Sequence, residues 1–341
     1  MPVDNLTMPG RRRVRVGDVE FRGFTQIRAQ KALAQIKGFL SRNPAYAKNR
    51  KFIEQYIDQR RKHDIGTLVG SICAETEVYG KADDAFSDAL PKIEEAIACL
   101  KLFHYWNDDF YGRYFGILGK VPRKVWRPML IYPRGTGFIG NECVWMGPLY
   151  EFELDSDRIR FMQDNAFPKL SKILAGENRS NIEQRIVSAV LWFAKATDVI
   201  LTDRARAEPS IARPIAKGKT RKPQAEMMAP YDRLVKLTVA LESLLILDES
   251  EPVASTLADR TALLLGKKYS DRKAIFEFVK RMYRRRSGVV HHGGKGILEG
   301  ELRQLTSLVQ SVIITLLKNV ERERLSSIES LQEWFLRKKL G

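Results

Sequence analysis

The sequence predicts a mainly α fold in two parts: an N-terminal, mostly helical domain that carries a small β element, and a C-terminal helical bundle. Two observations lead to this prediction. Apolar residues recur every three or four positions through most of the 341 residues, which is the pattern of amphipathic helices. Short stretches rich in aromatic and β-branched residues, broken by Pro and Gly, interrupt that pattern near the middle of the chain. We place the boundary between residues 1–181 and residues 182–341.

The N-terminal part is predicted to be helical except at its start and near its end. Residues 1–25 are predicted as an arm with one short strand, VRVGDVEFRGF. Residues 26–108 contain helical segments such as AQKALAQIKGFL. The β element is expected in the stretches VWRPMLIYP and CVWMGPLYEFELD, with a turn at PRGTGFIGN between them. Residues 157–195 return to the helical pattern.

The C-terminal part is predicted to be helical from Asp232 to its end. Segments such as DRLVKLTVALESLLIL and GELRQLTSLVQSVIITLLKNVERERL repeat apolar residues at helical spacing, as in a helical bundle. Residues 202–230 differ, because they are basic, contain prolines and have few large apolar side chains. We interpret them as a linker or insertion.

Positive charge is unevenly distributed along the chain. The formal net charge is +17. Residues 267–286 hold 9 basic against 2 acidic residues, and residues 1–50 hold 11 against 3. Clustered positive charge favours phosphate-rich partners such as nucleic acid. A solvated basic surface without a specific partner is the alternative.

The cysteines and the hydropathy of the chain argue against several further classes of site and partner. Cys73, Cys99 and Cys143 are far apart and form no CxxC pair or Cys/His cluster, so we predict no disulfide framework, no metal site and no cofactor. A cytoplasmic location is the expectation for such a chain. No apolar stretch reaches the roughly 18 residues that a membrane helix needs, so no membrane partner is expected.

One nucleotide-binding motif is present without its context. GTGFIG, at residues 135–140, matches the GxGxxG fingerprint of dinucleotide-binding proteins. That fingerprint must open a helix, whereas the next residues, NECVWMGPLYEFE, predict a strand. A nicotinamide-dependent enzyme is therefore a remote alternative, and a glycine-rich hairpin turn is preferred.

The stretch YRRRSGVVHHGG, at residues 283–294, concentrates cations and imidazoles. The preceding helix has an apolar stripe at Ile275, Val279, Met282 and Tyr283, and the helical period puts Arg286 next on that stripe. A guanidinium at such a position needs a partner. Glu242, the one acidic residue in the apolar run VALESLLIL, is the candidate.

Arginine and histidine without metal ligands suit RNA cleavage. Arginine can hold a phosphodiester and stabilise its developing charge, and histidine can transfer protons near neutral pH. The 2′-hydroxyl of RNA supplies the nucleophile. His291 lies five residues after Arg286, which is a rotation of about 140° on an ideal helix. The two side chains would diverge unless the helix bends or ends at Gly288 or at Gly293–Gly294.

The C-terminal sequence resembles the HEPN superfamily, and within it the ApeA-like HEPN domains. The resemblance covers roughly residues 182–325 and rests on DRLVKLTVALESLLILDE, LADRTALLLG and RKAIFEFVKRMYRRRSGVVHHGG. RIVSAVLWFAKA is similar to the family's first helix, so residues 202–230 would be an insertion. The resemblance implies a HEPN-type bundle and a homodimeric, metal-independent endoribonuclease with an Arg-x4–6-His motif. Many such proteins are toxins or effectors of antiviral defence and abortive infection.

The resemblance also implies roles for individual residues. Arg286 would bind the scissile phosphate, and His291 would be the general acid or base. Ser287 follows the arginine where many family members carry Asn, Asp or His, so the sequence departs from the family pattern at this position. Three other pairs also satisfy the spacing of the motif and remain open: Arg285 with His291, Arg286 with His292, and Arg285 with His292. Tyr283 is expected in core or dimer packing.

Two functions from different classes therefore remain open. The first is an RNase whose N-terminal domain senses a phage-derived or protein trigger, which is an analogy with the family. The second is a non-catalytic HEPN-like dimer that binds RNA or a partner protein. Loss of cleavage on replacing Arg286 or His291 separates the two.

Overall fold

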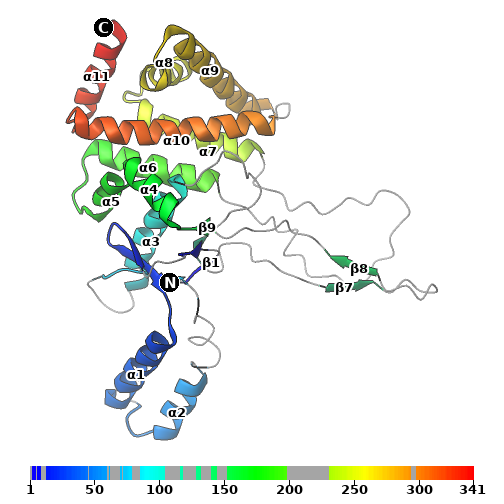
Figure 1. Ribbon diagram of the computed structural model, residues 1–341, viewed down its shortest axis with the longest axis vertical. Coiled ribbons are helices and arrows are strands. Elements are labelled where there is room, and N and C mark those ends of the chain that lie inside the picture. Colours follow the sequence, from blue (N-terminus) through cyan, green and yellow to red (C-terminus); the bar gives the residue numbers. More distant parts are fainter. Residues whose placement is uncertain are drawn as a thin grey trace.

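A computed structural model describes most of the chain (Figure 1). The described residues are 2–4, 6–8, 13–44, 46–59, 61, 70, 72–78, 85–103, 116–117, 128–131, 140–143, 152–197, 230–292 and 297–341. They form a mainly α fold with a small β element, as the sequence predicts. No helix in these ranges is long and apolar enough to cross a membrane.

The principal sheet has five strands in the order β3-β4-β5-β1-β6. Its strands are β1 (Pro2–Asp4), β3 (Arg13–Val16), β4 (Val19–Gly23), β5 (Ile72–Glu75) and β6 (Gly116–Ile117). All neighbouring pairs are antiparallel, with Val16 opposite Val19 and Phe21 opposite Ala74. Buried Val16, Val19, Phe21 and Ala74 belong to the main core.

The sheet corrects two expectations for the N-terminal part. The single strand expected in residues 1–25 is replaced by four, because β2 (Leu6–Thr7) also forms there and pairs in parallel with β9 (Phe152–Glu153). Strand β5 interrupts the region 26–108, which was expected to be helical. Its four residues are too few to show a period, and their pairing partners are distant in sequence.

A helical hairpin follows β4. Helices α1 (Gln26–Arg42) and α2 (Arg50–Gln59) share a small core of Leu33, Leu40, Ile53 and Ile57, separate from the main core. The hairpin lies at the end of the molecule opposite α8, α9 and α11 (Figure 1). Arg28 of α1 bonds to Glu75 and to the carbonyl oxygen of Gly23 and so ties the hairpin to the sheet.

Four helices connect the sheet to the bundle: α3 (Ala85–Leu102), α4 (Ser156–Asp164), α5 (Phe167–Ala175) and α6 (Asn181–Ala196). A capping box starts α6, because Ser180 accepts from the Glu183 amide at 3.3 Å and the Glu183 carboxylate accepts from the Ser180 amide at 2.9 Å. Arg179 makes a bidentate contact of 2.9 and 2.6 Å with Glu95 of α3.

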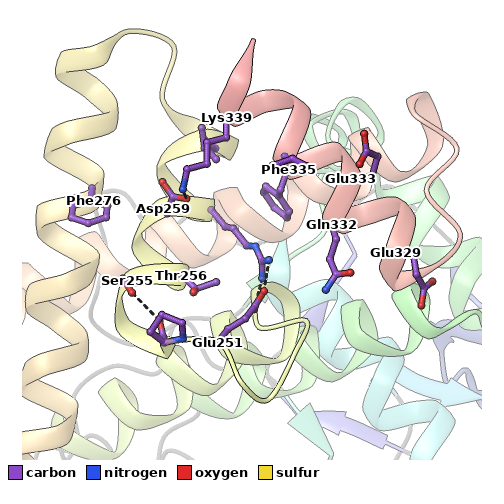
Figure 2. Close-up of a pocket in the computed structure, with 14 residues that line it drawn as sticks. Glu251, Ser255, Thr256, Asp259, Phe276, Glu329, Gln332, Glu333, Phe335 and Lys339 are labelled. Atoms are coloured by element: carbon purple, nitrogen blue, oxygen red, sulfur yellow. Dashed lines mark hydrogen bonds and ion pairs between the residues drawn. The ribbon is translucent and has the colours of Figure 1, made fainter.

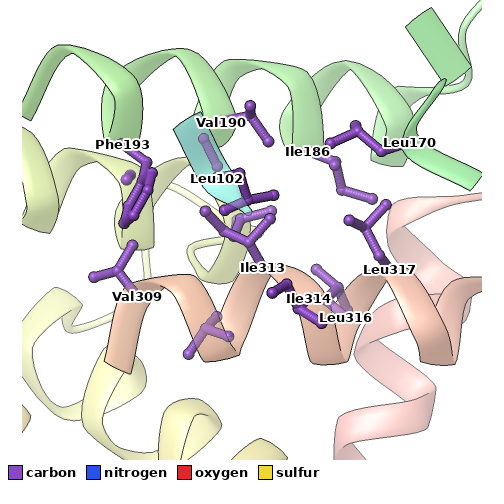
Figure 3. Packing of buried hydrophobic residues seen from close by; sticks show 14 of the residues in the cluster. Leu102, Leu170, Ile186, Val190, Phe193, Val309, Ile313, Ile314, Leu316 and Leu317 are labelled. Atoms are coloured by element: carbon purple, nitrogen blue, oxygen red, sulfur yellow. The ribbon is translucent and has the colours of Figure 1, made fainter. Parts of the chain in front are cut away.

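The C-terminal helices are α7 (Pro230–Leu245), α8 (Val253–Leu265), α9 (Tyr269–His292), α10 (Glu299–Arg322) and α11 (Ile328–Leu340). Helix α10 runs across the molecule, with α6 and α7 on one side and α8 and α9 on the other (Figure 1). Apolar side chains of α6 face those of α10 (Figure 3), and the labelled ones include Val190, Phe193, Val309 and Ile313. Leu102 of α3 lies between the two helices.

A β hairpin forms where the small β element is predicted in the middle of the chain, but only its first strand lies where it is expected. Strands β7 (Pro128–Ile131) and β8 (Gly140–Cys143) pair antiparallel, with Pro128 opposite Cys143. Strand β8 begins earlier than expected, because residues 140 and 141 of the predicted turn at 133–141 belong to it, and the rest of that turn lies outside the described residues. Of the second predicted strand, at 143–155, Cys143 is in β8, and residues 152–153 form β9, which pairs with β2 instead. The expected insertion at 202–230 also lies outside the described residues, except for Pro230, which opens α7. Among the described residues, Gly140 opens strand β8 and not a helix, whereas the dinucleotide-binding fingerprint must open a helix.

Candidate active site

Helix α9 presents the apolar stripe that the sequence predicts. Phe278, Val279 and Met282 are buried in the main core, and Tyr283 packs against it with partial burial. Arg286 lies one turn further along α9, and a quarter of its side chain is exposed. Because it continues the apolar stripe, Arg286 faces the bundle rather than bulk solvent.

Glu242 of α7 is the partner of Arg286, as predicted. The Arg286 Nη2 and Glu242 Oε1 atoms are 3.9 Å apart, and both side chains are about equally shielded, at 25% and 26% exposure. This distance permits an ion pair but is too long for a hydrogen bond. Within the described part of the chain, neither the buried Arg286 Nε nor Glu242 Oε1 has a hydrogen-bond partner. The guanidinium thus keeps donor capacity that its partner does not use.

Tyr283 completes the group around Arg286. The guanidinium carbon lies 5.5 Å from the centre of the Tyr283 ring, a cation–π distance. Burial raises the pKa of Glu242, and neither the Arg286 charge nor the hydrogen bond with Tyr283 outweighs that effect. Burial also raises the pKa of Tyr283, and the Glu242 carboxylate adds to this. Three side chains from α7 and α9 thus form a partly desolvated polar cluster.

The neighbouring arginines have different surroundings. Arg285 pairs with Glu301 near the start of α10, and Arg281 Nε lies 3.7 Å from the same carboxylate. Arg284 is exposed, and Ser287 is partly buried. Of the three consecutive arginines, Arg285 is thus neutralised by a close carboxylate, whereas Arg286 has only a loosely placed one.

The helical backbone continues through the two histidines. His291 and His292 are the last residues of α9, and their side chains lie outside the described part of the structure. Gly288 does not end the helix. Positions 286 and 291 are therefore about 140° apart around the helix axis, whereas positions 285 and 292 are within about 20° of one another.

Other possible reactive groups are less suited to catalysis. Cys73 and Cys99 are buried, and burial raises the pKa of both thiols, which makes them poor nucleophiles. Cys143 lies in β8, and its side chain is outside the described part. Among the residues that the structure describes, no group of three or more His, Cys, Asp or Glu side chains could hold a metal ion.

A cavity of about 700 Å³ lies between α8 and α11 (Figure 2). Its cations are already paired: Arg260 binds Glu251 at 2.6 and 2.7 Å, and Lys339 binds Asp259 at 2.8 Å. Arg286, Glu242 and Tyr283 are not among its lining residues. The cavity is therefore distinct from the cluster around Arg286.

No protein-family model, curated protein or solved structure matches this chain.

Proposed function

We propose that this protein is a metal-independent endoribonuclease of the HEPN type. In the proposed reaction, the 2′-oxygen of RNA attacks the adjacent phosphorus and the 5′-oxygen of the next nucleotide leaves. A base removes the 2′-hydroxyl proton and an acid protonates the leaving oxygen, so the products are a 2′,3′-cyclic phosphate and a 5′-hydroxyl. The chain's arginines and histidines can supply these roles without a metal ion.

The state of Arg286 is the observation that supports this function best. Its guanidinium is partly desolvated, and its counter-ion is 3.9 Å away without a hydrogen bond. A phosphate oxygen would satisfy donors that Glu242 leaves unused. Charge-assisted hydrogen bonds of this kind strengthen where water is partly excluded. Glu242 and Tyr283 are then positioning residues that hold Arg286 on the face of α9.

A homodimer accounts best for the spacing of Arg286 and His291. On a continuous helix, their positions differ by about 140°, so one protomer does not present both on a single face. The family resemblance implies two motifs lining one cleft. We therefore propose that Arg286 of one protomer acts with His291 of its partner, His291 being the general acid or base. His292, Arg285 and Ser287 would support the site from the same turns.

The biological role that fits this enzyme is defence or toxicity in the cytoplasm. An RNase held ready by its N-terminal part would respond to a phage-derived or protein trigger. This role rests on the family resemblance and not on the fold, since a fold by itself does not imply a function.

The test is cleavage of total RNA and tRNA in EDTA by wild type, Arg286→Ala and His291→Ala. We expect each variant to lose about 10²-fold or more of the activity, as when one transition-state contact is removed. The matched control is Arg284→Ala, which removes the same charge from an exposed position on the same helix. Mass spectrometry of the products should find 2′,3′-cyclic phosphate ends.

Arg285→Ala and His292→Ala decide between the alternative pairs. If they abolish cleavage while Arg286→Ala and His291→Ala do not, the active pair is Arg285 with His292. Equal cutting by all variants would mean that the nuclease activity arises elsewhere.

A non-catalytic binding module is the second candidate, and the Arg286–Glu242 pair is the observation that favours it. The pair joins α9 to α7 and would serve equally as a structural brace. In that case, Arg286→Ala would lower stability, RNA or partner binding would survive in the folded variant, and wild type with its trigger would cut no RNA.

A further inference from the structure

The turn between α1 and α2 concentrates positive charge on an exposed surface. We call residues 42–52 the hairpin tip. It carries four exposed cations, Arg42, Lys48, Arg50 and Lys51, and no Asp or Glu. It lies far from the candidate active site, at the opposite end of the molecule (Figure 1).

An aromatic stack lies at the same tip. The rings of Tyr46 and Phe52 are 5.5 Å apart and 15° from parallel, and those of Phe52 and Tyr56 are 5.9 Å apart and 29° from parallel. Tyr46 is 39% exposed and Phe52 is 38% exposed. Tyr56 packs on the small hairpin core, whereas Tyr46 and Phe52 continue the stack outwards. The exposed end of the stack therefore offers aromatic surface to an incoming flat ring.

Folding of the hairpin does not explain these side chains. Its core is formed by Leu33, Leu40, Ile53 and Ile57. Arg50 pairs with Glu54 at 3.1 Å, but the two side chains are 90% and 55% exposed, so the pair adds little stability. Within the described residues, Lys48 and Lys51 form no ion pair.

The position of the cations opposes the α2 helix dipole. Arg50 and Lys51 are the first two residues of α2, and its first turn contains no acidic residue. Positive charge at a helix N-terminus is unfavourable for the isolated helix, whereas a bound anion there is favourable. Asn49 caps the helix by accepting from the Phe52 amide at 3.0 Å. A phosphate beside this turn would relieve the excess of positive charge.

We propose that the hairpin tip binds single-stranded RNA, with unpaired bases stacking on Tyr46 and Phe52 and phosphates contacting Arg42, Lys48, Arg50 and Lys51. Exposed rings next to cations are how many proteins hold single strands, and bases stack in this way only when they are unpaired. A membrane surface fits less well, because the apolar face of α2 is buried against α1 and cannot enter lipid. The choice of RNA over DNA rests on the proposed function.

Binding is tested by fluorescence anisotropy with a labelled 12-nucleotide uridine-rich RNA. All proteins carry Arg286→Ala, so that cleavage does not interfere. Tyr46→Ala with Phe52→Ala should weaken binding about tenfold or more. Arg50→Gln with Lys51→Gln should weaken binding and lower the slope of log K against log salt by about 1.4. The glutamine variants also relieve the dipole conflict, so lost binding cannot be attributed to unfolding of α2.

The matched controls lie on the bundle. Lys267→Gln with Lys268→Gln removes two adjacent exposed cations, and Tyr269→Ala removes an aromatic residue that is 81% exposed. Both should bind the RNA within about twofold of the parent. Duplex RNA should compete poorly. Unchanged binding in the tip variants, or tip-dependent binding to anionic vesicles in place of RNA, would overturn the inference.

Failure of this inference is distinguishable from failure of the nuclease. If the tip variants bind normally while Arg286→Ala alone abolishes cleavage, the tip assignment is wrong and the nuclease stands. If the tip binds RNA but no triggered wild-type protein cuts it, the tip assignment stands. A single-stranded DNA of the same length forms a separate arm, and tighter binding of DNA would overturn the choice of RNA.

Discussion

At the scale of single residues, Glu242 is central to the candidate site. It is a carboxylate within an apolar run of α7, and burial raises its pKa despite the nearby Arg286. The folded protein therefore holds a proton on Glu242 at pH values where the unfolded chain has released it. The contribution of Glu242 to stability consequently falls as pH rises from its ordinary pKa of 4.5 through the raised folded value.

Glu242→Gln should remove this pH dependence. At pH 7, we expect the variant to be as stable as the wild type or more stable, by up to about 1 kcal/mol, because the pair is partly exposed and loose. The free energy of unfolding, variant minus wild type, should rise from pH 4.5 to pH 8. Urea unfolding followed by circular dichroism measures it. A difference that falls with pH would mean that the ionised pair with Arg286 stabilises the fold.

At the scale of elements, helix α9 contains both the apolar stripe that packs on the core and the two histidines. Gly288 is an interior glycine of this helix, and a Cβ placed there meets no described atom within 4 Å. Because glycine is a poorer helix former than alanine, it costs about 0.5–1 kcal/mol at such a position. A residue that weakens the helix between Arg286 and His291 is consistent with a need for close approach by RNA or by a second protomer.

Gly288→Ala should therefore raise stability by about 0.5–1 kcal/mol while lowering cleavage. Thermal unfolding and the RNA assay measure the two effects. Gly266→Ala is the control, because its Cβ would lie 2.6 Å from Arg272 Cγ and 2.9 Å from the Ala262 carbonyl oxygen, so stability should fall. Full cleavage by a stabilised Gly288→Ala would show that nothing packs closely against position 288.

At the scale of the whole molecule, one apolar core spans the predicted boundary at residues 181 and 182. The main core includes Leu100 and Leu102 of α3 together with residues of α6, α7 and α10. The Gln310 side chain of α10 donates to the Leu102 carbonyl oxygen. A structural change in the N-terminal part would therefore reach the bundle through directly packed side chains.

Residues 182–341 expressed alone should unfold at a lower temperature than the full chain and bind hydrophobic dyes. The reason is that removing α3 exposes the faces of α6 and α10 that it covers. Differential scanning calorimetry and dye fluorescence measure this. A fragment as stable as the full chain would establish residues 182–341 as an independent domain.

Much of the bundle follows from local pattern. The helical period predicts α7 to α11, and continuing the stripe from Ile275 to Tyr283 correctly places Arg286 opposite Glu242. The position of β7 is also predicted, whereas β8 begins within the residues predicted as a turn. These predictions succeed because each depends on residues close together in the sequence.

The sequence by itself determined the mainly α class, most helices of the C-terminal half and the identity of the Arg286 partner. Only the tertiary structure decided the five-stranded sheet, the different partners of Arg285 and Arg286, and the Tyr46–Phe52–Tyr56 stack. The physical reason is distance along the chain. Strand β5 pairs with residues about fifty positions or more before it. The stack forms because the turn after α1 places Tyr46 against Phe52 of α2. Such contacts leave no period in the sequence, because they arise only when separate elements pack.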